Sequence, residues 1–101
     1  MEKIVQGESI ILKLHEDLIA SNVKQFNLNV LELLEEDEDH DELILDLGET
    51  ENIDSVGVTF VVSLYKAANN EGRQFRVINS NEDIVQLFKL MKLDEFFEME
   101  E

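Results

Sequence analysis

A serine stands between a carboxylate and a glycine in the stretch Asp54-Ser55-Val56-Gly57, immediately before a long apolar segment. Three roles are open to such a hydroxyl: it can cap the start of a helix, attack a substrate as a nucleophile, or accept a phosphate. Serine is a preferred capping residue because its side-chain oxygen accepts a hydrogen bond from a backbone N–H two or three positions on. The same free N–H groups and the positive end of the helix dipole also favour an anion.

A nucleophilic serine would require a base within hydrogen-bond reach. The sequence contains two histidines, His15 and His40, and neither is near Ser55 along the chain. The G-x-S-x-G pattern of hydrolase nucleophile elbows is absent as well. We therefore predict that the protein is not an enzyme and has no catalytic residues. A serine hydrolase is the alternative from another class.

A second candidate site is the acidic run at residues 35–42, where Asp37, Asp39 and Asp41 have the D-x-D-x-D spacing of a calcium loop. Such a loop requires glycine at its sixth position and glutamate at its twelfth. Those positions hold Glu42 and Gly48. The run therefore predicts a solvated loop with no specific metal. No phosphate-binding Walker loop is present either, and we expect no cofactor.

The length of 101 residues predicts one domain that spans residues 1–101, and a hydrophobic fraction of 44% is enough to build a core. The formal net charge of −16 repels nucleic acid and anionic membrane surfaces, so neither is an expected partner. This charge serves solubility or steers the chain toward a basic partner. Because the sequence has no cysteine, no long apolar run and no signal peptide at its start, we expect a cytoplasmic protein.

The apolar patterns predict an α/β fold with the element order β-β-α-β-α-β-α, in which helices pack on a small mixed sheet. Alternating or continuous apolar residues indicate strands at residues 3–6, 9–15, 42–47 and 73–79. Helical spacing indicates helices that begin near residue 21, at 57–69 and at 80–91. The later alternation of strands with helices implies parallel pairing through right-handed crossovers. Residues 93–101 form a short apolar element before a charged end.

Polar residues and glycine mark the expected helix boundaries. Ser21 or Asn22 can cap the first helix, and Ser80 or Asn81 can cap the third. Gly72 suits the left-handed position after the second helix. The expected core-facing side chains of the second and third helices are Val58, Phe60, Val61, Val62, Leu64, Tyr65, Ala68, Ile84, Leu87, Phe88 and Met91.

Residues 43–98 contain, in order, an apolar strand, a spacer, the Asp-Ser-x-Gly turn, an apolar helix, a second strand and a helix of L-F-x-x-x-x-L type. This ordered pattern resembles the STAS domain family, the bacterial anti-sigma factor antagonists. The predicted β-β-α start agrees with the start of that family. The resemblance implies a STAS-like fold for the whole chain and a regulatory role through protein–protein contact.

Carried over residue by residue, the resemblance places the family's phosphorylated serine at Ser55, its acid at Asp54 and its turn glycine at Gly57. The implied partner-binding residues are Asp54, Ser55, Val56 and Gly57, with Val56 where a second hydroxyl residue often stands. The implied partner is an anti-sigma factor that is also a serine kinase with a histidine-kinase-like ATPase fold. The unphosphorylated antagonist binds this partner and frees the sigma factor, and a phosphatase reverses the mark.

The segment His15–Leu18, with the sequence HEDL, departs from the G-E-L-D-like segment of the family. In the family, the glycine and aspartate of that segment contribute to the partner-facing surface, so the departure bears on which partner is recognised. It leaves a second role open, that of an unphosphorylated STAS scaffold subunit in a lipid-transport or signalling complex. Both roles require the same fold.

Overall fold

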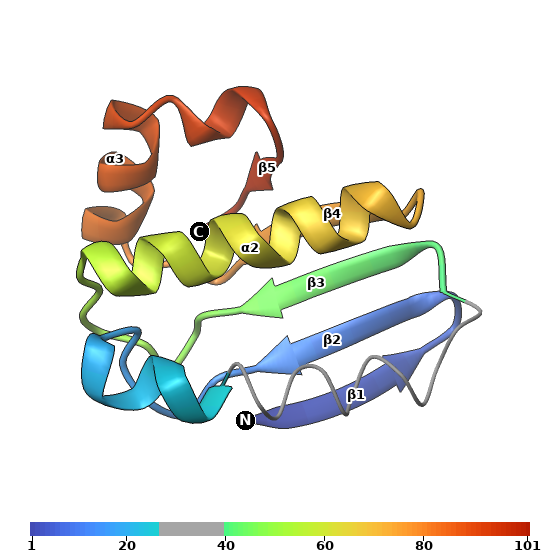
Figure 1. Ribbon diagram of the computed structural model, residues 1–101, viewed down its shortest axis with the longest axis horizontal. Coiled ribbons are helices and arrows are strands. Elements are labelled where there is room, and N and C mark those ends of the chain that lie inside the picture. Colours follow the sequence, from blue (N-terminus) through green and yellow to red (C-terminus); the bar gives the residue numbers. More distant parts are fainter. Residues whose placement is uncertain (27–39) are drawn as a thin grey trace.

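The computed structural model describes residues 1–26 and 40–101, which contain a five-stranded sheet with helices packed on it (Figure 1). The strands lie in the sheet in the order of the sequence: β1 (Glu2–Gln6), β2 (Ser9–Lys13), β3 (Glu42–Asp46), β4 (Gln74–Ile78) and β5 (Glu98–Met99). β1 pairs antiparallel with β2, and each later pair is parallel. The predicted α/β class, mixed sheet and element order are confirmed.

Strand β3 lies in the middle of the sheet and is buried on both faces. Leu43, Ile44 and Leu45 are each at most 4% exposed, although successive side chains of a strand point to opposite faces. This burial is typical of a parallel strand inside a sheet. The continuous apolar run at residues 42–47 predicted it.

The longest helix, α2 (Ser55–Asn70), crosses the face of the sheet that is turned toward the viewer in Figure 1. A helix that begins at residue 20 is described to residue 26, and α3 (Glu82–Leu90) is followed by the 3-10 turn η1 (Leu93–Glu95). The start of α2 lies near the carboxyl ends of β2 and β3 (Figure 1). This edge of a parallel sheet is where α/β proteins commonly build their sites.

Helix α2 is anchored by its apolar side chains. Those that are buried are Val58, Phe60, Val61, Leu64 and Ala68. Each of the larger ones contributes about 1.5–3 kcal/mol of hydrophobic free energy when fully buried. The set of side chains expected to face the core was too large, however. In α2, Val62 and Tyr65 are only partly buried, and at the end of α3 Met91 is 48% exposed.

The structure corrects the expected start of the first helix, decides between the two candidate caps of α3, and divides the expected C-terminal element. The first helix begins at residue 20, so Ser21 and Asn22 lie inside it and do not cap it. Asn81, rather than Ser80, caps α3, because its side chain accepts a hydrogen bond from the N–H of Ile84 at 2.9 Å. The chain end, read as one short apolar element, divides into η1 and the unpredicted strand β5.

The acidic run at residues 35–42 is described only in part. Asp37 and Asp39 lie outside the described residues, so the solvated loop stays a prediction.

Within residues 1–26 and 40–101, no helix is long and apolar enough to cross a bilayer.

Candidate functional site

Asp54 joins the starts of two helices. Its Oδ1 accepts a hydrogen bond from the backbone N–H of Gly57 at 2.8 Å, which makes Asp54 the N-cap of α2. Its Oδ2 accepts one from the backbone N–H of Ala20, also at 2.8 Å, at the start of the first helix. These bonds, that from Gly57 foremost, lower the pKa of the Asp54 carboxyl. Asp54 is therefore an anion at neutral pH, at a point where two helix dipoles stabilise negative charge.

Gly57 is required by a close approach between two backbones. It lies within the first turn of α2, and a Cβ added to it would stand 1.9 Å from the carbonyl oxygen of Leu18. The segment around Leu18 is held in place by backbone hydrogen bonds, from the N–H of Leu18 to Asn52 at 3.0 Å and from the N–H of Asp54 to Leu18 at 3.1 Å. The glycine of the Asp-Ser-x-Gly stretch thus permits packing and not a left-handed turn.

Ser55 does not cap α2, as one interpretation of the sequence proposed, because Asp54 takes that position. Ser55 is instead the first residue of the helix, and it is exposed. Among the residues that the structure describes, its hydroxyl forms no hydrogen bond. The hydroxyl is therefore accessible to a second protein, at the positive end of a 16-residue helix.

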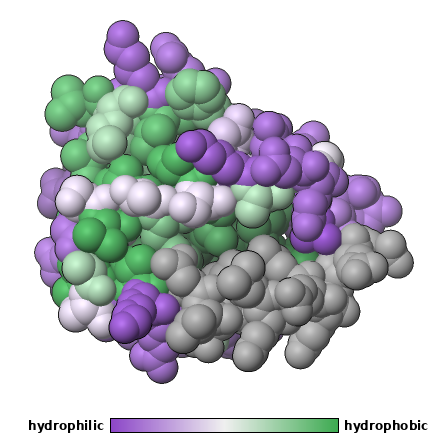
Figure 2. Space-filling model, viewed as in Figure 1, coloured by the Kyte–Doolittle hydropathy of each residue, from purple (hydrophilic) through white to green (hydrophobic). Residues whose placement is uncertain are grey.

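Two further hydroxyls follow Ser55 on the same side of α2, one and two turns along. The hydroxyl of Thr59 donates to the backbone carbonyl of Ser55 at 3.0 Å, and that of Ser63 donates to the carbonyl of Thr59 at 2.9 Å. All three residues are exposed. Figure 2 shows a pale band of intermediate hydropathy that crosses the molecule over α2, with hydrophobic surface on both sides of it. In this row, Ser55 differs because its hydroxyl is not bound to the helix backbone.

A groove with a volume of about 450 Å³ lies beside Ser55, between the start of α2 and the end of α3. Most of its lining is apolar. The lining residues are Ile53, Asp54, Ser55, Val58, Thr59, Leu87 and Met91. Sequence patterns placed Leu87 and Met91 in the core, so their part in this groove was missed. No signal in the sequence distinguishes an apolar residue of a groove from one of the core.

The segment His15–Leu18, whose sequence differs from the family pattern, forms hydrogen bonds with the loop that leads from β3 to Ser55. The carboxylate of Asp17 accepts hydrogen bonds from the backbone N–H of Glu51 at 2.9 Å and from the side-chain amide of Asn52 at 2.9 Å. These bonds, the one from the Asn52 side chain foremost, lower the pKa of Asp17. The hydroxyl of Thr50 also donates to the carbonyl of Glu16 at 3.0 Å. Asp17 therefore fixes residues 51 and 52 of the loop that precedes Asp54 and Ser55.

Among the described residues, no histidine lines the groove beside Ser55. His15 is engaged elsewhere: Nδ1 lies 2.8 Å from Oε2 of Glu49, and Nε2 lies 3.2 Å from Oε1 of Glu2. The contact with His15 is the main cause of the lowered pKa of Glu49. The described part of the chain also contains no group of three potential metal ligands.

The domain is a small α/β domain of the STAS class. Its features are the strand order of the sheet, Asp54 with its two accepted hydrogen bonds, and the exposed Ser55. The model of the STAS domain family matches residues 1–101, and the chain belongs to this family. A comparison with curated protein sequences gives no match.

Solved structures with the same fold include anti-sigma factor antagonists. The chain is similar to the Thermotoga maritima protein TM1081, a candidate anti-sigma factor antagonist, with a TM-score of 0.86 and 22% identity over 99% of this chain and 85% of that one. It is also similar to a Ser-to-Glu variant of Moorella thermoacetica RsbS, with a TM-score of 0.77 and 17% identity over 97% and 83% of the two chains. For phosphorylated SpoIIAA of Bacillus, the TM-score is 0.73 and the identity 16%, over 99% and 89%. At these identities, the likeness establishes the fold.

Proposed function

We propose that the protein is an anti-sigma factor antagonist whose binding to a partner is switched by phosphorylation of Ser55. The supporting observation is the Ser55 hydroxyl itself, which is exposed, without a hydrogen-bond partner in the described structure, and adjacent to an apolar groove. The partner is an anti-sigma factor with serine kinase activity and a histidine-kinase-like ATPase fold. It binds the segment of Asp54, Ser55, Val56 and Gly57, and a phosphatase reverses the modification.

The charge of a phosphate explains how such a switch works. Phosphoserine carries about −1.5 to −2 charges at neutral pH, and Asp54 and the exposed Glu51 already make this surface negative. An interface that fits a hydroxyl would have to accept a desolvated dianion, and like charges brought together at an interface cost several kcal/mol. The helix itself tolerates the phosphate, because an anion at its N-terminus is favourable. The effect is therefore on binding and not on folding.

The experiment begins with affinity capture on three baits: the unmodified chain, Ser55→Ala and Ser55→Asp. Ser63→Ala and Ser63→Asp are matched controls, since Ser63 is exposed on the same side of α2 two turns away. We expect the unmodified chain and Ser55→Ala to retain a histidine-kinase-like ATPase, Ser55→Asp to lose it, and both Ser63 variants to retain it.

The captured kinase is then incubated with the chain and Mg·ATP, and the products are mapped by peptide mass spectrometry. Phosphate should be found at Ser55. Phosphate confined to Thr59 or Ser63 would contradict the assignment. A partner that all five baits retain, with no phosphate on any of them, would favour the unphosphorylated scaffold subunit instead.

A further inference from the structure

Asp54 occupies the place where a phosphate on Ser55 would otherwise bind. The start of an α-helix leaves four backbone N–H groups without a partner in the helix, and such groups commonly bind phosphate. At α2 these groups belong to residues 54–57. The N–H of Asp54 donates to the carbonyl of Leu18 at 3.1 Å, and that of Gly57 donates to Oδ1 of Asp54 at 2.8 Å. The start of α2 therefore has few of its usual donors left for a phosphate.

Two helix starts hold the carboxylate of Asp54. Its Oδ2 accepts a hydrogen bond from the N–H of Ala20 at 2.8 Å, so the same side chain also caps the first helix. The bonds from Gly57 and Ala20, with a smaller contribution from the N–H of Val56, lower the pKa of Asp54. A phosphate on Ser55 could bind these amides only by displacing an anion that both helix starts stabilise.

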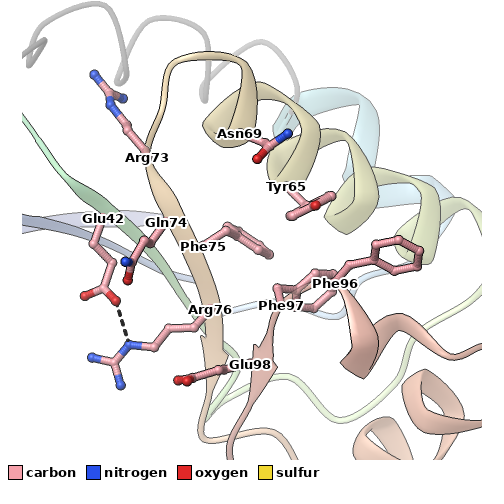
Figure 3. A pocket seen from close by; sticks show the side chains of 10 residues that line it. All are labelled: Glu42, Tyr65, Asn69, Arg73, Gln74, Phe75, Arg76, Phe96, Phe97 and Glu98. Carbon is pink, nitrogen blue, oxygen red and sulfur yellow. Dashed lines mark hydrogen bonds and ion pairs between the residues drawn. The ribbon is translucent and has the colours of Figure 1, made fainter.

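No cation beside Ser55 replaces these amides. Among the described residues, no lysine, arginine or histidine lines the groove beside Ser55. Arginine binds phosphate well, and the sequence contains two arginines, Arg73 and Arg76. Both line a pocket of about 390 Å³ near the other end of α2, to which that helix contributes Tyr65 and Asn69 (Figure 3). Tyr65 is ten residues beyond Ser55, on the order of 15 Å along the helix.

The two arginines are also paired with carboxylates. Nε of Arg76 lies 3.1 Å from Oε2 of Glu42, the pair marked by the dashed line in Figure 3, and its Nη1 lies 3.4 Å from Oε2 of Glu100. Nη1 of Arg73 lies 3.2 Å from Oε2 of Glu71. Neither guanidinium is therefore available to a phosphate at the start of α2.

Acidic residues predominate in the described segments around Ser55. They are Glu49, Glu51 and Asp54 before α2, Glu16 and Asp17 in the segment bonded to that loop, and Glu82 and Asp83 at the start of α3. The basic residues of the same segments are His15, which lies 2.8 Å from Glu49, Lys24 in the first helix and Lys92 after α3. This excess of negative charge opposes the second ionisation of a phosphate. Asp54 is the nearest of these anions along the chain.

We propose that Asp54 is a positioning residue that keeps a phosphate on Ser55 off the start of α2 and leaves it exposed to the partner and to the phosphatase. This inference rests on the proposed function and deepens it. The phosphate acts at the surface because the helix start that would bind it is already occupied. Without the Asp54 side chain, the phosphate would turn back onto the N–H of Gly57.

The test uses chains in which phosphoserine is incorporated at position 55 during synthesis, so that no kinase is required. ³¹P NMR follows the second ionisation of the phosphate, whose ordinary pKa is about 6. Asp54→Asn keeps one capping oxygen and loses the charge, so the titration midpoint should fall by about half a pH unit. The midpoint should fall further in Asp54→Ala, where the phosphate gains the N–H of Gly57.

The amide resonance of Gly57 is a second readout, one that a purely structural role of Asp54 would not change. With Asp54 present, this resonance should follow the carboxyl in the acid range and change little near pH 6. In Asp54→Ala it should follow the phosphate. A broad-specificity serine phosphatase, which uses water to release inorganic phosphate and restore serine, should act several-fold more slowly on Asp54→Ala than on Asp54→Asn. Circular dichroism verifies that each variant folds.

Phosphoserine at position 63 is the matched control, because Ser63 is exposed on the same helix two turns further on. Its titration midpoint should not change in Asp54→Asn. Lys92→Ala should shift the midpoint at position 55 by less than Asp54→Asn does. A larger shift in Lys92→Ala would overturn the proposal, because Lys92 would then bind the phosphate. A midpoint that ignores Asp54→Asn, or a Gly57 amide that follows the phosphate while Asp54 is present, would overturn it as well.

The incorporated phosphoserine separates this inference from the proposed function. If the midpoint ignores Asp54 while a kinase modifies Ser55 and controls partner capture, the positioning role is wrong and the switch stands. If Asp54 controls the phosphate as expected but no kinase modifies Ser55, the positioning role stands and the switch is wrong.

Discussion

The starts of α2 and α3 have the same kind of side-chain cap, but the serine next to each cap lies in a different environment. At α2, Asp54 accepts a hydrogen bond from the N–H three residues on, that of Gly57, at 2.8 Å. At α3, Asn81 accepts one from the N–H of Ile84, again three residues on, at 2.9 Å. Each cap also reaches a distant segment, Asp54 to Ala20 and Asn81 to the carbonyl of Glu51 at 3.1 Å. The capping hydrogen bond is therefore equivalent at the two sites, and both capping residues have extended backbone.

The serine beside each cap makes the difference. Ser55 follows its cap and is exposed, whereas Ser80 precedes its cap and is 3% exposed. The hydroxyl of Ser80 has no hydrogen-bond partner in the described structure. Ser55, one position after its cap, therefore presents its hydroxyl to other proteins. Ser80, one position before its cap, has its hydroxyl buried inside the fold. A capping side chain with a neighbouring serine thus yields a candidate site at α2 and a structural helix start at α3.

The third residue after the cap also differs, and changing it should have the largest effect. Gly57→Ala places a Cβ 1.9 Å from the Leu18 carbonyl oxygen, so one backbone must move. We expect a loss of about 3 kcal/mol, since overpacking costs typically 1–3 kcal/mol and backbone offers little relief. The thermal midpoint should fall by more than about 10 °C in a domain of this size.

Gly72→Ala is the control for this prediction. The residue has φ +73° and no atom within 4 Å of an added Cβ, so only backbone strain of about 1–2 kcal/mol is expected. Differential scanning calorimetry compares the two variants. A Gly57→Ala variant as stable as Gly72→Ala would show that the Leu18 contact does not restrict α2.

Removal of the caps should cause the next largest loss of stability. The loss should depend on pH for the cap of α2 and be independent of pH for the cap of α3. Asn81→Ala should cost about 1 kcal/mol at any pH, because an amide does not titrate. Asp54→Ala removes the caps of two helices and should lower the thermal midpoint further at neutral pH. The folded pKa of Asp54 is lowered, so its contribution is present above the ordinary carboxyl pKa of about 4 and is lost as pH falls through the lowered value.

Thermal unfolding of both variants across the acid range provides the measurement. The gap between Asp54→Ala and the unmodified chain should narrow as the carboxyl protonates, while the gap for Asn81→Ala stays constant. Asp17 and Glu49 also have lowered pKa values, but they titrate equally in both variants. A gap for Asp54→Ala that ignores pH would mean that charge does not contribute to its caps.

Ser80→Ala should stabilise the domain by about 1 kcal/mol, because it removes a buried hydroxyl that has no partner. Ser55→Ala is the matched control and should change stability by less than about 0.5 kcal/mol, as is usual at an exposed position. Urea unfolding of the two variants measures the difference. A destabilised Ser80→Ala variant would indicate that the hydroxyl has a bonding role.

Ser55→Asp should also change stability little, although its effect on binding is large. The added charge gains from the helix start and loses against Asp54, and each effect is below about 1 kcal/mol at an exposed position. The midpoint should stay within a few degrees while partner binding is lost. A much lower midpoint, or amide shifts spread across the sheet, would indicate a conformational switch.

The sequence predicted those parts of the fold whose cause is local. The continuous apolar run of β3 and the helical spacing of α2 contain their own evidence, and both elements lie where they were expected. β5 was missed because it has two residues and exists only through its pairing with Arg76 and Val77. The cap of the first helix was misplaced because the acceptor, Asp54, is 34 residues away from Ala20.

The candidate site divides in the same way. The Asp-Ser-x-Gly stretch drew attention to Ser55 from its residue types alone, and the structure adds that Asp54 and not Ser55 is the cap. The groove beside Ser55 could not be predicted, because Leu87 and Met91 have the same apolar character as core residues. Their place in the groove depends on the tertiary arrangement of α2 and α3.

The strand order of the sheet has a consequence for how the chain is made. Because spatial order and sequence order coincide, each new strand joins a free edge, and none has to be inserted between two strands already paired. The β1–β2 hairpin forms from local contacts, and each later strand is added after its crossover segment has been synthesised. β5, with two residues, ends this growth, since so short an edge is a poor template for another strand. The direction in which the ribosome delivers the chain is thus also the direction in which the sheet can grow.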